Sequence, residues 1–168
     1  MSKSVCDEQI YSSIYNDYSN DLHNYLYYKY GDQFNPNDTV QDAFVKLWNN
    51  CKEVTLEKAK GYVFMIAKNM ILNNIKHQKV VLKHQQVKPK YYTNENPEFL
   101  LEKEQFLQKY QRALSKLTEE QRVVFLLNKT EGKKHQEIAD LLDITKKVVE
   151  YRIYSAFKII KAEIKELK

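Results

Sequence analysis

The chain has 168 residues, enough for one or two small domains, and its 43% hydrophobic and 29% charged content is ordinary for a soluble folded protein. Three glycines and three prolines leave little material for the turns of a β-sheet, so we expect an all-α fold. No apolar run of about eighteen residues and no signal-peptide pattern occur, so we expect a cytoplasmic protein without membrane insertion.

Residue types that carry catalysis or bind metals do not form any recognisable site. Cys6 and Cys51 are too few and too far apart in the sequence for a disulfide framework or a zinc cluster, which fits a reducing compartment. No glycine-rich phosphate loop and no Ser-His-Asp order occurs. The four histidines lie on polar stretches without cysteine or carboxylate at ligand spacing. We therefore expect no catalytic residue, no metal and no cofactor.

The net charge of +5 and the pI near 9.0 suggest an anionic partner, but the charge is unevenly distributed. Residues 1–50 carry three Lys/Arg against seven Asp/Glu, residues 51–84 carry seven against two, and residues 85–168 carry seventeen against thirteen. A protein that only coats phosphate has little use for an acidic part, so a further partner is implied. The alternative is that this charge fluctuation has no functional meaning.

Three helices are predicted in the N-terminal part of the chain. The first covers residues 7–30 and ends at Gly31, a typical C-terminal glycine. The second follows a start signal at residues 35–38, and the third covers residues 58–78. Each has an apolar stripe at helical spacing, so the three can form one core.

The periodic pattern then breaks into Lys, Gln, Tyr, Asn and two prolines, which is typical of a linker. We therefore predict a first domain over residues 1–79, a linker over residues 80–97 and a second domain over residues 98–168. The second domain begins with a helix whose stripe includes Phe99 and Phe106, and a capping box at Thr118 starts the next helix.

A helix-turn-helix pattern follows in the second domain. Ile138, Ala139 and Leu142 are predicted to face inward, and Ala139 is small because the next helix must cross close to it. Thr145 is a suitable N-cap for that helix. Its predicted apolar face consists of Val149, Ile153, Ala156, Ile160 and Ile164.

The turn of this motif contains Asp143, where glycine is usual, and aspartate is among the residues that tolerate a left-handed conformation. The order of the elements is that of a reader of the DNA major groove. The alternative is a solvated amphipathic hairpin in an all-helical domain, because this geometry also occurs outside DNA binding.

Three segments in this order resemble the signature segments of the sigma-70 family: DTVQDAFVKLW at residues 38–48, KGYVFMIAKN at residues 60–69, and the C-terminal block from Thr118. More narrowly, the chain resembles the extracytoplasmic-function group, which keeps only two end domains joined by a linker. The resemblance covers residues 7–165. A short segment, VEYRI at residues 149–153, further resembles members from the Bacteroidetes.

The resemblance implies that the helix of the first segment docks on the coiled coil of the polymerase clamp. Its matching positions are Asp38, Gln41, Asp42, Phe44 and Trp48. Acidic residues that face an arginine-rich coiled coil would explain the acidic start of the chain. Most of the area of Phe44 and Trp48 is expected in the core, and Asp38 can be an N-cap, so this prediction rests on Gln41 and Asp42.

The resemblance also implies that the third helix and the loop before it melt and read the minus-ten promoter element. The candidate base-capturing loop is Asn49, Asn50, Cys51 and Lys52. The candidate residues on the helix are Tyr62, Lys68, Asn69, Asn73, Lys76 and His77. Asparagine on a helix surface can equally be solvated, and Tyr62 can be packed.

In the second domain the resemblance assigns the helix after Thr145 to the minus-thirty-five element. The positions that match the base-contacting face are Lys147, Tyr151, Arg152 and Ser155. The phosphate contacts are Lys133, Lys134 and Lys158. Many members have basic residues where this chain has Glu150, Phe157 and Ile159, which predicts a weaker electrostatic grip on DNA.

These observations predict a sigma factor, not an enzyme, that binds core RNA polymerase and promoter DNA and directs promoter recognition, melting and initiation. The family also implies an inhibitory anti-sigma factor, and we expect the free protein to be a monomer. The alternative is a stand-alone helix-turn-helix regulator, which would need symmetric half-sites and no polymerase. A nucleic-acid-modifying enzyme is a third class, but the sequence offers no residues for its chemistry.

Overall fold

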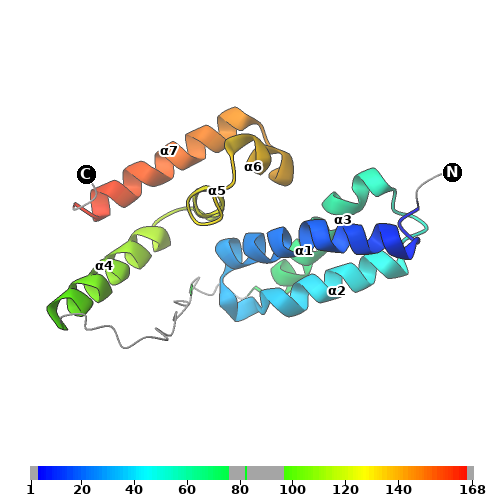
Figure 1. Cartoon of the computed structure of the whole chain (residues 1–168), viewed down its shortest axis with the longest axis horizontal. Helices are drawn as coiled ribbons and strands as arrows, with labels where there is room; N and C mark the ends of the chain where they lie inside the picture. The colour runs from blue at the N-terminus through cyan, green and yellow to red at the C-terminus, as the bar shows by residue number, and fades with distance from the viewer. Residues whose placement is uncertain (1–3, 76–81, 83–96, 166–168) are drawn as a thin grey trace. The chain divides into compact units, whose positions relative to one another are not determined.

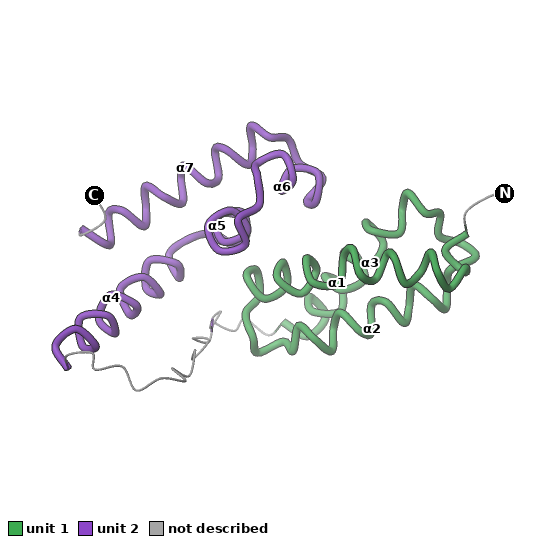
Figure 2. The backbone as a smooth tube through the Cα atoms, in the orientation of Figure 1, with its two compact units in different colours: residues 1–81 green, residues 82–168 purple. Residues whose placement is uncertain are grey.

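The chain folds into α-helices without β-strands in the residues that the structure describes, and the predicted all-α fold is confirmed (Figure 1). The computed structural model describes residues 4–75, 82 and 97–165. Contacts divide the chain into two compact units, Met1–Val81 and Leu82–Lys168 (Figure 2).

The predicted linker falls almost entirely outside the described residues. Only Leu82 and Pro97 of the range 80–97 are described, so the predicted boundaries of the linker stay a prediction. The two helical units themselves are each described below.

Residues 4–75 of unit 1 form three α-helices and one 3₁₀-helix. They are α1 (Glu8–Tyr30), η1 (Asp32–Phe34), α2 (Pro36–Asn49) and α3 (Leu56–Asn74). The carboxylate of Asp7 caps α1 by accepting hydrogen bonds from the backbone N–H groups of Gln9 and Ile10. Gly31 ends α1 with a φ of 87°, which confirms the predicted C-terminal glycine.

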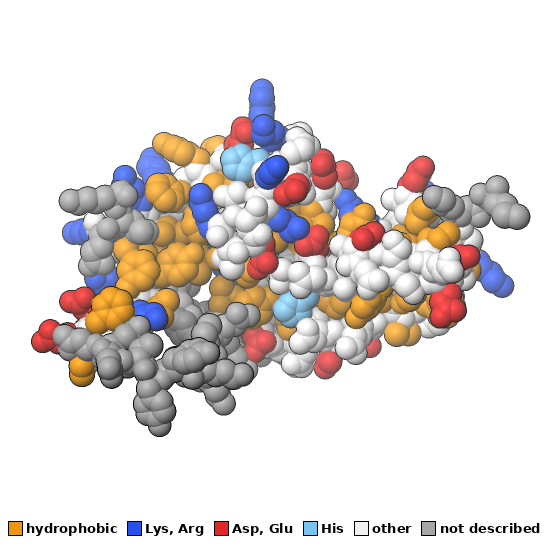
Figure 3. All heavy atoms as spheres, viewed as in Figure 1, with side chains coloured by type: hydrophobic (Ala, Val, Ile, Leu, Met, Phe, Trp, Pro, Cys, Tyr) orange, Lys and Arg blue, Asp and Glu red, His pale blue; other side chains and the backbone are white. Residues whose placement is uncertain are grey.

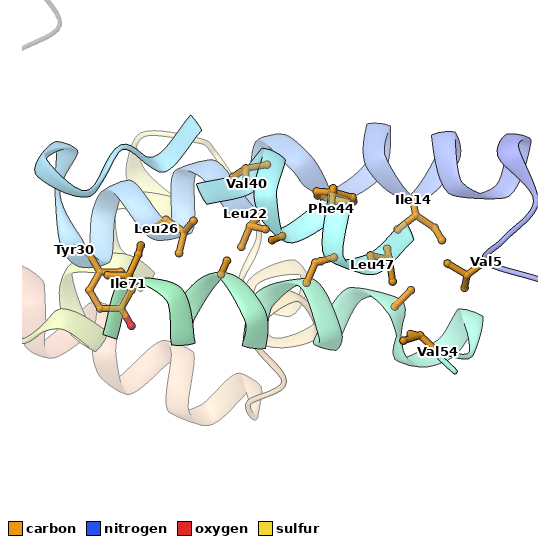
Figure 4. Close-up of a cluster of buried hydrophobic side chains, with 14 residues drawn as sticks. Val5, Ile14, Leu22, Leu26, Tyr30, Val40, Phe44, Leu47, Val54 and Ile71 are labelled. Carbon is orange, nitrogen blue, oxygen red and sulfur yellow. The ribbon is translucent and has the colours of Figure 1, made fainter. Parts of the chain in front are cut away.

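The three α-helices of unit 1 share one apolar core (Figure 4). Its most deeply buried residues are Leu22 and Leu26 of α1, Ala43, Phe44 and Leu47 of α2, and Val63 and Ala67 of α3. These positions recur at spacings of three and four, so burial follows the helical period that the sequence displays.

Cys6 and Cys51 form a disulfide bond, with their Cα atoms 5.0 Å apart. Their separation in the sequence suggested that they would not form a disulfide framework, and this expectation was wrong, because they form this one bond. Separation along the chain is not distance in space, because α1 and α2 pack as an antiparallel pair and the end of α2 returns to the start of α1 (Figure 1).

In unit 2 the described range 97–165 forms four α-helices, of which α4, α5 and α6 each pack on the last one. They are α4 (Pro97–Ser115), α5 (Glu119–Lys129), α6 (His135–Leu142) and α7 (Lys146–Glu163). The predicted capping box starts α5: the Gln121 N–H donates to Thr118 Oγ1 at 3.2 Å, and the Thr118 N–H donates to Gln121 Oε1 at 3.0 Å.

The helix-turn-helix consists of α6, a short turn and α7. Ile138 and Ala139 are buried as predicted, but Leu142 is only half-buried and Leu141 is buried instead. The predicted apolar face of α7 is confirmed, because Val149, Ile153, Ala156, Ile160 and Ile164 are all buried. Thr145 caps α7 by accepting a hydrogen bond from the Val148 N–H at 3.3 Å.

Only the C-terminal end of α4 packs into the core of unit 2. Leu114 is buried, whereas Phe99 and Phe106, which share the predicted stripe with it, are 54% and 37% exposed. The first part of α4 runs out beyond the other helices of its unit, and its hydrophobic side chains lie on the surface (Figure 3). Periodicity therefore identified the helix but overstated how much of it is covered.

The close crossing at Ala139 generates a stability prediction. Ala139 is 2% exposed, and a larger side chain there would push the helices of unit 2 apart. We expect Ala139→Leu to lower the free energy of unfolding by about 1 to 3 kcal/mol, measured by urea denaturation. Ala162→Leu, on the exposed side of α7, is the matched control, and an equal loss in both variants would contradict the crossing as the cause.

The turn at Asp143 generates a second prediction. Asp143 has a φ of 55° and a ψ of 46°, a left-handed conformation that glycine adopts without a Cβ penalty. We expect Asp143→Gly to raise the free energy of unfolding by roughly 0.5 to 1 kcal/mol. Asp140→Gly, inside α6, should instead lower it, and a loss in both variants would show that Asp143 makes a contact that glycine cannot replace.

Candidate nucleic-acid and polymerase interfaces

The predicted polymerase-binding residues occupy two edges of α2. Gln41 is exposed beside α1 and lines a cleft of about 310 Å³ together with Tyr15 and His23. Asp38 and Asp42 are exposed on the other edge and line a cleft of about 400 Å³ that α3 closes. The Gln41 amide therefore lies on one edge of α2, and the carboxylates of Asp38 and Asp42 lie on the other.

The N-terminus of α2 is not capped by Asp38. Asn35 is the N-cap residue, in a left-handed conformation with a φ of 45° and a ψ of 68°, and Pro36 is the first residue of the helix. Asp38 lies in the first turn, where a negative charge is favourable beside the positive end of the helix dipole. The alternative reading of Asp38 as a cap is thus corrected, and its exposed carboxylate remains available as a surface acceptor.

The two aromatic positions of α2 have different environments. Phe44 is 1% exposed and belongs to the core, so it supports α2 from below and does not present a surface. Trp48 is 43% exposed, and its ring packs edge to face on Tyr11 of α1 with ring centroids 5.0 Å apart. Of the two, only Trp48 can be reached by a partner.

Tyr11 joins α1 to α2 below this surface. Its hydroxyl donates a hydrogen bond to the Phe44 carbonyl oxygen at 2.7 Å. Burial, and secondarily the neighbouring Tyr15, raises the pKa of Tyr11 above its ordinary value, so the hydroxyl keeps its proton and remains a donor. This contact holds the exposed face of Trp48 in place.

The predicted base-capturing loop is held closed by its own contacts. Asn50 Nδ2 donates to the Lys46 carbonyl oxygen at 2.9 Å and to the Tyr62 hydroxyl at 3.1 Å. Cys51 is half-buried, and its sulfur is bonded to Cys6, so it is not a thiol in this structure. Asn49 and Lys52 are exposed.

On α3 the predicted minus-ten residues divide between two faces. Tyr62, Asn69 and Asn73 lie along one edge, spaced by seven and four. Lys68 lies on the neighbouring face, because adjacent residues of a helix are about 100° apart. Lys76 and His77 lie outside the described residues.

Two apolar residues on the face of Lys68 were not singled out by the sequence analysis. Met65 is 49% exposed and Leu72 is 46% exposed, and both lie on the side of α3 opposite the core. Their spacing of three and four from Lys68 was the available signal, but an apolar residue on a helix is ordinarily assigned to the core.

On α7 an outward stripe lies opposite the buried face. It consists of Lys147, Tyr151, Tyr154 and Lys158, spaced by four, three and four, and all are exposed. Tyr151 is 72% exposed and Tyr154 is 69% exposed. Arg152 and Ser155, which were predicted to contact bases, are half-buried at the flank of this stripe. Tyr154 lies outside the positions that the resemblance assigned to bases, but it belongs to the same exposed stripe.

Charges around the start of α7 offset the acidic Glu150. The Glu150 carboxylate lies 3.8 Å from Lys146 Nζ and 3.6 Å from His135 Nδ1. Lys133 is half-buried and Lys134 is exposed in the segment that enters α6. The Lys134 N–H donates to Glu137 Oε2 at 2.7 Å, so this entry is fixed by a backbone contact while the lysine side chain stays at the surface.

Neither a metal centre nor a membrane segment emerges from the described part of the chain. Within residues 4–75, 82 and 97–165, no three His, Cys, Asp or Glu side chains are grouped so that they could hold a metal ion. None of the helices in those ranges combines the length and the apolar character that a bilayer crossing requires.

Comparison with protein families assigns both units. The family model described as Sigma-70 region 2 matches residues 14–80, and the model described as Sigma-70, region 4 matches residues 107–160. The region 4 match is of the extracytoplasmic-function type. No curated protein matches the chain. Members of this family are non-enzymatic transcription initiation factors. The chain therefore belongs to the extracytoplasmic-function group of the sigma-70 family and has the role of a sigma factor in promoter recognition.

Proposed function

We propose that this protein binds core RNA polymerase through unit 1 and contacts a bipartite promoter through both units. The free energy of these contacts would drive the melting of the DNA. The observation that supports this most strongly is the presence of sigma-70 regions 2 and 4, in that order, on two separate helical units. Regions of this kind imply interaction with both RNA polymerase and promoter DNA. The polymerase, and not this protein, would then catalyse RNA synthesis.

The exposed surface of α2 is the proposed contact with polymerase. Asp38 and Asp42 offer carboxylates along one edge, and Gln41 and Trp48 offer an amide and an aromatic ring along the other. Carboxylates pair well with arginine side chains, which donate two parallel hydrogen bonds. An aromatic ring that is partly buried at its base loses little entropy on binding. We leave Phe44 out of the contact because it lies in the core.

The loop before α3, together with α3 itself, is the proposed minus-ten site. An unstacked base needs hydrogen-bonding groups for its edge and a surface on which to stack. Asn69 and Asn73 supply amides on the edge that also carries Tyr62, and Lys68 supplies a cation beside it. Asn49, Asn50 and Lys52 border the same edge through the Asn50 contact with Tyr62. Lys76 and His77 are proposed from the sequence alone.

The outward stripe of α7 is the proposed minus-thirty-five reader. A helix that lies in the major groove contacts bases with its outermost side chains and phosphates with residues at its ends. Tyr151 and Tyr154 are the most exposed large side chains of the stripe, and Lys147 and Lys158 lie near its two ends. Arg152 and Ser155 can contribute from the flank, with Lys133 and Lys134 on the phosphates.

Three further proposals are an inhibitory anti-sigma partner, which the family implies, a cytoplasmic location and a monomeric free state. No described residue identifies the anti-sigma factor. A factor that competes for a shared polymerase would need such an inhibitor to keep its genes silent.

The experiment that tests the proposed function is in vitro transcription from a library of promoter fragments with purified core polymerase, with and without this protein. New start sites that depend on the protein are the expected result. If the protein shifts some fragments by itself but creates no start sites with a matched core enzyme, a stand-alone regulator is the correct function and the polymerase role fails.

The α2 surface generates a prediction for this assay. We expect Gln41→Ala combined with Asp42→Ala to lower specific initiation at least about tenfold, because a contact is removed from both edges of the helix. Binding of the isolated protein to promoter DNA should be unchanged. Asn16→Ala combined with Asp17→Ala, an exposed amide and carboxylate on α1, is the matched control. Equal losses in the two double variants would contradict a specific role for α2.

The α7 stripe generates a prediction for DNA binding. We expect Lys158→Ala to weaken binding to all sequences alike and to reduce the slope of log affinity against log salt by about one, as the loss of one phosphate contact requires. Tyr154→Ala should instead change the preferred minus-thirty-five sequence, measured by binding selection. Lys103→Ala on α4 is the control. An unchanged salt slope for Lys158→Ala would show that α7 does not lie in the groove as proposed.

A further inference from the structure

The disulfide between Cys6 and Cys51 joins the start of α1 to the loop proposed to capture a base. Cys6 directly precedes the capping residue Asp7, and Cys51 lies one residue beyond Asn50, where α2 ends. Both cysteines are half-buried, so each remains open to small molecules in solution. No part of the proposed sigma function requires a covalent bond at this place.

Two buried valines hold the cysteine-bearing segments next to one another independently of the disulfide. Val5 is 1% exposed and Val54 is 9% exposed, and both belong to the core of unit 1. They lie at the same end of that core (Figure 4). The two thiols would therefore stay close after reduction, and the high effective concentration of one near the other favours re-formation of the bond by thiol–disulfide exchange.

The closed loop must rearrange before it can hold a base. The amide of Asn50 already donates to Lys46 and Tyr62, so it can donate to a base edge only if these contacts open. Rotation of the Asn50 side chain would break these contacts, and a shift of the backbone at residues 49–52 would make room for the base. A covalent bond from Cys51 to the segment before α1 restricts that movement because Val5 anchors this segment in the core.

We propose that Cys6 and Cys51 are a reversible thiol modification site that reacts with small-molecule disulfides, and that the oxidised form restrains the base-capturing loop and lowers promoter opening. The chemical half of this proposal is the reversible reaction of the two thiols, and the functional half is the effect of the bond on promoter opening. Only the functional half rests on the proposed function. In the reduced form the loop can open and accept the base.

The reaction is a thiol–disulfide exchange in two steps. One cysteine, as a thiolate, attacks a sulfur of oxidised glutathione, which breaks that disulfide and releases one glutathione as a thiolate. The second cysteine then attacks the protein sulfur of the mixed disulfide and releases the other glutathione. The protein loses two electrons and two protons in total, and the two glutathione molecules take them up as thiols.

The chemical half is tested by equilibrating the full chain in buffers with different ratios of reduced to oxidised glutathione, trapping free thiols with an alkylating reagent and counting the labels by mass spectrometry. We expect one transition between two labels and none, with an intramolecular bond between Cys6 and Cys51. Labels that remain on both cysteines at the highest oxidised ratio, or bonds only between chains, would overturn the proposal.

The functional half is tested by promoter opening with core polymerase, followed by a fluorescent base at the minus-ten element. We expect the oxidised form to open the promoter about tenfold less than the reduced form, the scale of one lost base contact. Cys6→Ser removes the bond and leaves the loop sequence intact, so it should open the promoter like the reduced form in both buffers. Cys6→Ala is a second variant of the same kind, and circular dichroism verifies the fold of both.

The outcomes distinguish this proposal from the proposed function. If reduced protein opens promoters and oxidised protein does so equally well, the switch is wrong and the sigma function stands. If the reduced form opens no promoter with a matched core enzyme, the proposed function fails, while the labelling experiment still decides whether the cysteine pair reacts.

Discussion

Burial of Phe44 and Leu47 in the core of unit 1 fixes the rotation of α2 about its axis. Once these residues face inward, Gln41 and Trp48 must emerge beside α1, and Asp38 and Asp42 must emerge beside α3. The same constraint acts on α3, where Val63 and Ala67 face the core. The exposed polar groups that α2 and the described part of α3 contribute to these proposed surfaces are placed by apolar packing on the opposite side of each helix.

Unit 2 depends on the same kind of constraint at a tighter contact. Ala139 allows two helices to approach closely, and the left-handed Asp143 reverses the chain between them. The Ile144 N–H donates to the Ala139 carbonyl oxygen at 3.0 Å, which ties the turn to the helix before it. With Val149 and its apolar neighbours turned inward, the opposite stripe of α7 faces outward as a continuous surface of lysine and tyrosine. Beside that surface, the carboxylate of Glu150 is paired with Lys146.

In the proposed minus-ten loop, the hydrogen bonds of Asn50 lie next to the disulfide bond of Cys51. The Asn50 amide donates to two internal partners, and a base that binds to this N–H group must replace these contacts by equivalent ones. A loop that replaces its own hydrogen bonds by hydrogen bonds to a base can discriminate between bases without binding DNA tightly. In the proposed switch, the bond between Cys51 and Cys6 would limit the movement of this loop.

The sequence by itself predicted the helical character of both units, the helix ends at Gly31, Thr118 and Thr145 and much of the buried stripes, because each depends on neighbours three or four residues away. The cap at Thr145, the left-handed Asp143 and the buried face of α7 all follow from such local rules. The family likeness of residues 14–80 and 107–160 was likewise visible in local segments.

Only the tertiary structure decided which residues meet across helices and which stay exposed. Cys6 and Cys51 are 45 residues apart in the sequence, and only the antiparallel packing of α1 on α2 brings them into bonding distance. Leu114 near the end of α4 is buried, whereas Phe99 and Phe106 of the same apolar period are exposed, because none of the described helices of unit 2 extends along the first part of α4 (Figure 1). Periodicity records that a face is apolar, whereas burial also depends on where the other helices end, and that information is not local to any segment.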